Sequence, residues 1–270
     1  MKRLVLVVLV ALACSCTKKK KAPAVNWPDQ YSLVTVQSGH TYKVLQIGPI
    51  TEKGKHAGLG ISYISYARDF PALTAAADEL FEFARAQAEA TDDKLVAVLA
   101  KLGFDPTQKV SQSTDWNLVY TRGADGVWTR LHENDDAPFP KLAAQTDVDE
   151  RDLAAQKEVA ANVKEFLEQL DKGKIEKTYD ELDPAVKKTV TRDEWTKKIA
   201  DQRASYGPLE GRQQFAVVQT TAVTGGPKGK FIINRFHSKF RSKAHAEEVV
   251  SEMLGQDGNW HLVGYALTSS

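Results

Sequence analysis

Three charged side chains in the second half of this 270-residue chain have the types needed to pair with each other or to hold an anion. Arg203 lies near the end of a predicted helix, and Arg212 and Glu247 lie in predicted strands of the same segment. A charge in a small fold is normally paired, so we expect a structural ion pair between helix and sheet. The alternative is a contact with an anionic ligand, because two guanidinium groups can hold a carboxylate or a phosphate through paired hydrogen bonds.

The other reactive residue types form no catalytic or metal-binding pattern. None of the six histidines stands in an H-E-x-x-H motif or at ligand spacing from a cysteine. No nucleophile elbow, phosphate-binding loop or complete dinucleotide-binding motif is present. We therefore expect no catalytic residue, no metal and no cofactor. The chain holds 36 basic and 35 acidic residues, so its charge does not predict a nucleic-acid partner either.

The N-terminus has the layout of an export signal. Two basic residues, Lys2 and Arg3, precede the ten-residue apolar run LVLVVLVALA, which ends at Ala13. A ten-residue helix is about 15 Å long, half of the roughly 30 Å that a membrane-spanning helix must cross. Residues 1–13 are therefore predicted to be a signal peptide rather than a membrane anchor.

Both cysteines of the chain, Cys14 and Cys16, follow this run directly. The sequence Ala-Leu-Ala-Cys at residues 11–14 resembles the bacterial lipoprotein signal, which implies cleavage before Cys14 and lipidation of that cysteine. Cys16 is the alternative lipidation site, and an ordinary secretory signal cut near Ala13 is the other possibility. Residues 14–26 include four consecutive lysines and are interpreted as a solvated tether.

The first globular segment, residues 27–131, is predicted to be an α+β domain. Strand-like runs at 31–36, 41–47 and 60–67 are rich in β-branched and aromatic residues. Apolar residues at helical spacing then predict a helix that opens at 69–71, and residues 92–103 predict a second helix. Two further strands flank a turn at 123–126. The predicted order is β-β-β-α-α-β-β, followed by a linker at 132–147 that is rich in acids and prolines.

The second globular segment, residues 148–270, is also predicted to be α+β. Three helical patterns precede four strand-like runs, at 212–223, 230–240, 244–254 and 259–267, which indicates helices segregated from an antiparallel sheet. In the run 230–240, Phe231 and Ile233 have one parity while Phe236 and Phe240 have the other. A β-bulge near residues 234–235 would bring both sets to the same face.

Approximately residues 153–268 resemble family 4019 of the bacterial domains of unknown function. The resemblance rests on an Arg…Gly…Arg pattern after a Trp-bearing helix, on an aromatic-rich strand, on a Glu-bearing strand and on a terminal D-G-x-W-x-V-x-G-Y pattern, which reads DGNWHLVGY at residues 257–265. The matching residues are Trp195, Arg203, Gly207, Arg212, Phe231, Phe236, Phe240, Lys243, Glu247, Asp257, Gly258, Trp260, Val263, Gly264 and Tyr265. The resemblance implies a cone like that of nuclear transport factor 2 (NTF2-like, cystatin-like), in which a curved sheet wraps a long helix, and it implies no particular activity.

These observations predict where the protein is located more clearly than what it does. We expect an exported lipoprotein that is anchored to the bacterial cell envelope and faces the periplasm or the outside. Its partners would be the lipid bilayer, through the anchor, and an envelope protein or a small ligand. A non-catalytic binding or interaction module is the first hypothesis. A pocket-bearing NTF2-like enzyme or small-ligand carrier is the second.

Overall fold

The structure, a computed structural model, describes residues 30–104, 114–131, 148, 153–221, 223 and 228–269 of the chain. Cys14, Cys16, the predicted tether and the predicted linker lie outside these residues. The chain divides into two units of α+β structure, an N-terminal unit (residues 30–149) and a C-terminal unit (residues 150–269), which are described separately. None of the described helices is long and apolar enough to span a membrane.

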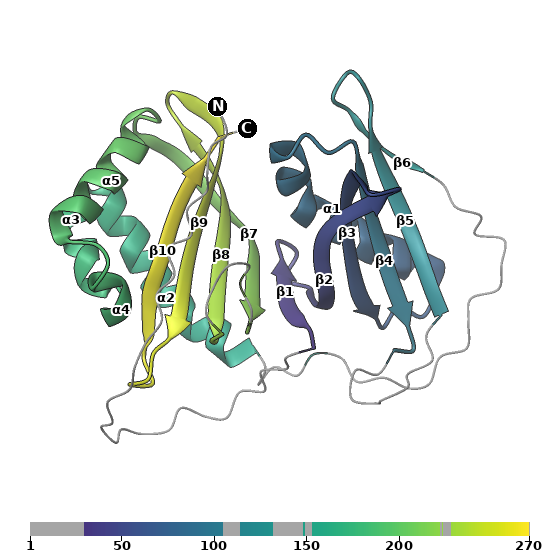
Figure 1. Cartoon of the computed structure of the whole chain (residues 1–270), viewed down its shortest axis with the longest axis horizontal. Helices are drawn as coiled ribbons and strands as arrows, with labels where there is room; N and C mark the ends of the chain where they lie inside the picture. Colours follow the sequence, from purple (N-terminus) through teal and green to yellow (C-terminus); the bar gives the residue numbers. More distant parts are fainter. Residues whose placement is uncertain are drawn as a thin grey trace. The chain divides into compact units, whose positions relative to one another are not determined.

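The N-terminal unit is a six-stranded sheet with a long helix, α1, packed on it (Figure 1). The sheet order follows the chain, and β3 and β4 are parallel while the other neighbouring strands are antiparallel. Asp69 caps α1 by accepting a hydrogen bond from the Ala72 backbone amide, which satisfies a donor that the helix cannot pair internally. The elements are β1 (Ser32–Val36), β2 (Thr41–Glu52), β3 (Lys55–Ser65), α1 (Phe70–Ala90), β4 (Leu95–Leu102), β5 (Thr114–Arg122) and β6 (Trp128–Leu131).

The prediction of a second helix at residues 92–103 is wrong, because this segment forms strand β4 between β3 and β5. Alternate residues of β4, from Val96 to Leu102, are buried, which is the period of a strand. The residues between them are also mostly apolar, so the run lacks the alternation of an exposed strand and resembles a short apolar helix. The order of the unit is therefore β-β-β-α-β-β-β.

The C-terminal unit packs its helices on one face of a curved four-stranded antiparallel sheet of order β10-β9-β8-β7 (Figure 1). A capping box between Thr191 and Glu194 starts the helix that carries Arg203. The elements are α2 (Ala154–Asp171), α3 (Ile175–Thr178), the short 3-10 helix η2 (Tyr179–Glu181), α4 (Pro184–Lys187), α5 (Arg192–Ala204), β7 (Leu209–Thr220), β8 (Phe231–Phe240), β9 (Lys243–Leu254) and β10 (Trp260–Thr268).

Large apolar side chains fill the space between the helices and this sheet. Phe166 of α2 and Phe240 of β8 are each 1% exposed, and both tryptophans of the unit, Trp195 and Trp260, are buried in the same cluster. The indole Nε1 of Trp195 donates a hydrogen bond to Thr178 Oγ1 at 2.9 Å, so its polar atom is paired. The core positions α2 and α5 against the sheet, and these elements carry the charged residues discussed next.

The predicted bulge in β8 is also wrong, because the register shift between β7 and β8 adds a residue to β7 instead. Gln214 pairs with Phe236 and Ala216 pairs with Arg235, which leaves Phe215 as the extra residue. Strand β8 keeps a regular alternation, with the even-numbered positions from 232 to 240 buried. Two of these inward positions are polar, Asn234 and Ser238, and for this reason the apolar pattern alone did not show the alternation.

Candidate functional site

Glu248 on β9 is the centre of a polar network inside the C-terminal unit. Its side chain is fully buried, and each carboxylate oxygen accepts two hydrogen bonds. Oε1 accepts from Arg203 Nη1 at 3.1 Å and from the Tyr265 hydroxyl at 2.7 Å. Oε2 accepts from Arg212 Nε and from Ser238 Oγ, both at 2.6 Å. The carboxylate is thus satisfied by donors from α5, β7, β8 and β10.

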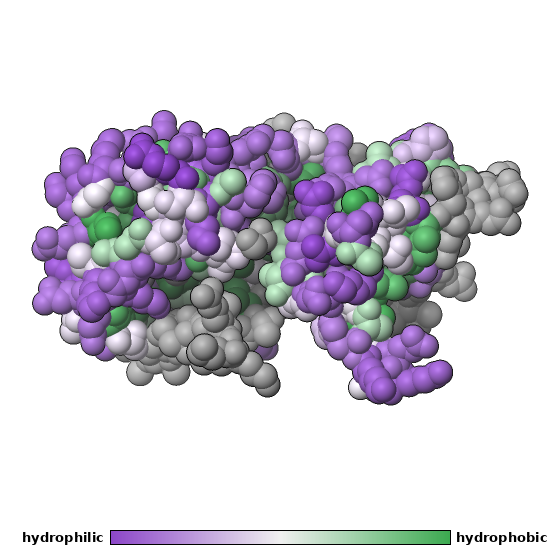
Figure 2. All heavy atoms as spheres, turned by 90° about the horizontal axis from the view of Figure 1, so that it is seen from above, coloured by the Kyte–Doolittle hydropathy of each residue, from purple (hydrophilic) through white to green (hydrophobic). Residues whose placement is uncertain are grey.

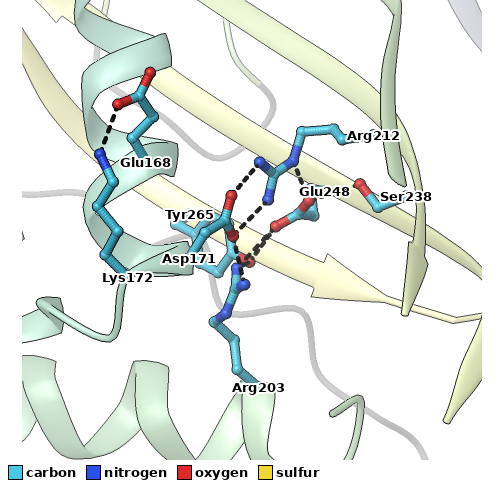
Figure 3. A network of polar contacts seen from close by, with 8 residues as sticks. All are labelled: Glu168, Asp171, Lys172, Arg203, Arg212, Ser238, Glu248 and Tyr265. Atoms are coloured by element: carbon cyan, nitrogen blue, oxygen red, sulfur yellow. Dashed lines mark hydrogen bonds and ion pairs between the residues drawn. The ribbon is translucent and has the colours of Figure 1, made fainter. Parts of the chain in front are cut away.

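Asp171, the last residue of α2, binds the same two arginines from the side of the helix (Figure 3). Its Oδ1 lies 2.7 Å from Arg203 Nη2, and its Oδ2 lies 2.7 Å from Arg212 Nη1. Figure 3 shows Asp171 between the two guanidinium groups, with Glu248 on the opposite side of both. Two positive and two negative side chains therefore form a closed, charge-matched cluster, which we call the arginine network.

The pKa directions in this network follow from its pairing. Burial opposes the charge of Arg212, but its hydrogen bonds to Asp171 and Glu248 outweigh burial and raise its pKa. Burial likewise opposes the charge of Arg203, while Tyr265, Glu248 and Asp171 raise its pKa. Burial and then the neighbouring Glu248 charge raise the pKa of the Tyr265 hydroxyl, which stays a hydrogen-bond donor. The network is therefore ionised at the arginines and neutral at the phenol.

The structure brings Arg203 and Arg212 together, but their partner is Glu248 and not the predicted Glu247. Glu247 points to the other face of the sheet, where its carboxylate lies 2.6 Å from Arg235 Nε. Successive residues of a strand face opposite sides, so a difference of one position exchanges the core face for the outer face. Even-numbered positions of β9, from Ala246 to Glu252, are the buried ones.

This geometry fits a structural role better than contact with an anion. Asp171 and Glu248 already occupy the positions around the two guanidinium groups that an anionic ligand would take. The four side chains connect α2, α5, β7 and β9, so the arginine network holds two helices on the sheet. Removing one partner of a buried ion pair typically costs about 3–5 kcal/mol, because the other charge is left buried and unpaired.

A second group of polar residues, not singled out from the sequence, lines a cavity of about 240 Å³ beside α2. Glu165 of α2, Glu181 of the 3-10 helix and Glu252 of β9 are its acidic residues, and His261 is also part of its lining. Asn162 Nδ2 donates to Glu252 at 3.2 Å, and Gln169 Nε2 donates to Glu181 at 2.8 Å. We call this site the acidic cavity.

Two glutamates of the acidic cavity, Glu181 and Glu252, have raised pKa values. Burial, and then the charge of Glu165, raise the pKa of Glu181 to about 7. Burial also raises the pKa of Glu252 to about 7, against a lowering effect of the Asn162 hydrogen bond. A sequence signal was present, because Asn162, Glu165 and Gln169 follow one another at helical spacing beside the apolar stripe of α2. Among the described residues, no group of three or more His, Cys, Asp or Glu is placed to hold a metal ion.

The helices on a curved antiparallel sheet define the C-terminal unit as an α+β domain that carries a buried arginine network. Residues 162–265 match the model of a family described as "Protein of unknown function (DUF4019)", which confirms the resemblance inferred from the motif residues. The matched segment contains every member of the arginine network. No curated protein and no solved structure matches the chain.

Proposed function

We propose that this protein is a lipid-anchored component of the bacterial cell envelope whose C-terminal unit is a non-catalytic binding module. The observation that carries the binding role is a cavity of about 360 Å³ between α2 and strands β7 and β8. Small-molecule sites commonly have volumes of roughly 300–1,000 Å³. The cavity lies beside the arginine network, in which each charge has a partner of opposite sign.

The architecture proposed for this unit is the NTF2-like cone. The 18-residue helix α2 packs its apolar side on β8, β9 and β10 through one core cluster, as the long helix of such a cone would. In this unit, however, buried tryptophan and phenylalanine side chains fill the interior. The binding role is therefore proposed for the cavity beside α2 and not for a chamber inside the cone.

The location is proposed from the N-terminal sequence and agrees with the character of the surface. On the face drawn in Figure 2, hydrophilic residues predominate and hydrophobic ones form small separate patches. Among the described positions, the exposed large hydrophobic residues are Val127 and Leu131, both in the N-terminal unit. An acyl chain on Cys14 would supply the membrane contact that this face does not offer.

Metabolic labelling with palmitate tests the anchor in a bacterium that expresses the full chain. We expect Cys14→Ser to abolish labelling and to leave the signal peptide uncleaved, while Cys16→Ser leaves labelling unchanged. Labelling lost only in Cys16→Ser would show that Cys16, and not Cys14, carries the lipid. Labelling that is absent from the unaltered chain, or equal in both variants, would contradict the proposed lipidation.

A second candidate function, proton-transfer catalysis, is favoured by the acidic cavity. A carboxyl group with a pKa near 7 can give or take a proton at neutral pH, as Glu181 and Glu252 could. This alternative requires turnover of a substrate that is lost in Glu252→Gln and retained in Glu247→Gln. A structural role for Glu252 predicts equal behaviour of both variants in a panel of small-molecule substrates.

A further inference from the structure

The cavity between α2 and strands β7 and β8 combines an apolar wall with hydrogen-bond donors. Val163 and Leu167 of α2 and Phe236 of β8 form much of its apolar part. The lining residues that carry hydrogen-bond donors are Lys164, Arg212, Gln214 and Asn234, and Glu168 adds a carboxylate. A site of this kind suits a ligand with an apolar body and one acceptor group, because the polar contacts fix its orientation.

Asn234 is the most informative residue of this lining. Its side chain is 1% exposed, and its Oδ1 accepts a hydrogen bond from Gln214 Nε2 at 2.7 Å. Its Nδ2 is buried and has no partner among the described residues. Buried polar groups are normally paired, so an unpaired amide donor in a cavity wall indicates an acceptor that is supplied from outside.

The charges around the cavity favour a negatively charged acceptor. Lys164 is exposed and forms no hydrogen bond or ion pair within the described part of the chain. The neighbouring Glu168 is paired with Lys172 at 2.9 Å, and Arg212 is paired within the arginine network. Lys164 therefore keeps an ammonium group with no direct ion-pair partner in the described part of the chain, and its charge interacts with Glu168 only at longer range.

We propose that this cavity binds a small monocarboxylate with an apolar body. The carboxylate accepts from the Asn234 amide and pairs with the Lys164 ammonium, and the body packs against Leu167 and Phe236. A carboxylate offers several acceptor positions and can therefore serve an amide and an ammonium group at the same time. This inference deepens the proposed function and rests on the binding role given there to the C-terminal unit.

Calorimetric titration of the full chain in detergent with phenylacetate and with phenethyl alcohol tests the ligand class. The two probes share a carbon skeleton and differ in the carboxylate, and a titration into detergent alone corrects for partitioning. We expect saturable binding of phenylacetate, at least about tenfold tighter than binding of phenethyl alcohol. No saturable phenylacetate binding, or equal affinity for both probes, would overturn the inference.

Neighbouring alanines on α2 provide a matched pair of variants that locates the site. Ala160 lines the cavity and Ala161 does not, and both are exposed on the same helix. We expect Ala160→Phe to weaken phenylacetate binding at least about tenfold by filling the cavity, and Ala161→Phe to change it less than about twofold. Equal effects of the two substitutions would place the ligand elsewhere.

Variants of two lysines of α2 distinguish a direct contact between Lys164 and the ligand from a general effect of charge on binding. Lys164 lines the cavity, and Lys157 is an exposed lysine of the same helix that does not. We expect Lys164→Glu to weaken binding about tenfold and Lys157→Glu to leave it within about twofold. Equal weakening by both variants would contradict a contact with Lys164.

Asn234→Leu tests the unpaired donor with two readouts. Leucine has a similar shape and no donor to leave unpaired, so the urea midpoint of the C-terminal unit should stay equal or rise. Phenylacetate binding should weaken at least about tenfold. A variant that binds phenylacetate as the unaltered chain does would refute the role of Asn234. Loss of phenylacetate binding leaves palmitate labelling intact, so failure of the ligand and failure of the anchor are distinguishable.

Discussion

Two buried glutamates on the same strand have opposite surroundings. Glu248 and Glu252 both point from β9 toward the helices and are 0% and 3% exposed. Glu248 accepts four hydrogen bonds, two of them from arginines. Glu252 accepts one from the uncharged Asn162 and faces Glu181 across the acidic cavity.

This difference shows that burial alone does not decide the charge of a carboxyl group here. Near Glu248, the end of α5 and the start of β7 supply arginines, and these compensate its negative charge. Near Glu252, α2 supplies a further carboxylate and an amide whose hydrogen bond lowers the pKa, and burial outweighs this hydrogen bond and raises the pKa. The same strand therefore carries a charged structural residue and, four positions later, a carboxyl group that titrates near neutrality.

The largest expected effect comes from removing the charge of Glu248. Glu248→Gln leaves two largely buried arginines with Asp171 as their one carboxylate, and we expect the free energy of unfolding to fall by about 3–5 kcal/mol. Hydrogen exchange of the β9 amides measures this for the C-terminal unit.

Glu247→Gln is the matched control for this change. Glu247 pairs with a single arginine, Arg235, on the other face of the sheet, and its side chain is 17% exposed, so its replacement should cost less than that of Glu248, about 1.5–3 kcal/mol. Equal losses in the free energy of unfolding for the two variants would contradict the stronger stabilising role given to Glu248.

The next effect is a pH dependence that belongs to Glu252. Its pKa is raised from 4.5 to about 7, so between these values the folded chain binds more protons than the unfolded chain. The free energy of unfolding should therefore decrease as the pH rises from 4.5 to 7, by at most about 3 kcal/mol from this residue. Urea unfolding at several pH values measures the slope.

Substitution by glutamine measures how much each of the two glutamates, Glu181 and Glu252, contributes to this pH dependence. Glu252→Gln cannot ionise and should reduce the slope, and the double variant with Glu181→Gln should remove most of it. A slope unchanged in the double variant would assign the pH dependence to other groups.

The smallest expected effect is that of Tyr265→Phe, which removes one of the four donors to Glu248. Three donors remain, so we expect a loss of about 1.5 kcal/mol in the free energy of unfolding. A loss as large as that of Glu248→Gln would show that the phenol, rather than the arginines, determines the stability of the network.

The sequence predicted the two arginines of this network but not their acidic partners. The two arginines were identified by their positions in the helix and the strand, and the family match covers both. To choose between Glu247 and Glu248, one must know which alternate residues of β9 face the core. The sequence does not show this, because the adjacent pairs Glu247-Glu248 and Val249-Val250 place the same residue type on both faces. Asp171 could not be assigned from spacing, because its contact with the arginines depends on how α2 crosses the sheet.

The fold, too, could be predicted only in part from the sequence. The α+β class, helix α1, the core stripe of α2 and the capping box of α5 agree with the local sequence patterns. Strand β4 did not follow from its sequence because a central strand is apolar on both faces, and that pattern does not differ from a short buried helix. Periodicity identifies an element reliably where one side of it faces water.

The parallel pairing of β3 and β4 has a consequence for how the N-terminal unit folds. Antiparallel neighbours joined by a short turn can pair as soon as both are made, as β2 and β3 can. Strand β4 pairs with β3 across a connection that contains α1, and the backbone at Gly58 comes so close to the Leu95 carbonyl that a Cβ there would lie 2.3 Å from its oxygen. Pairing β4 with β3 closes a longer loop than the β2–β3 turn does, so we expect this crossover to limit the folding rate of the unit.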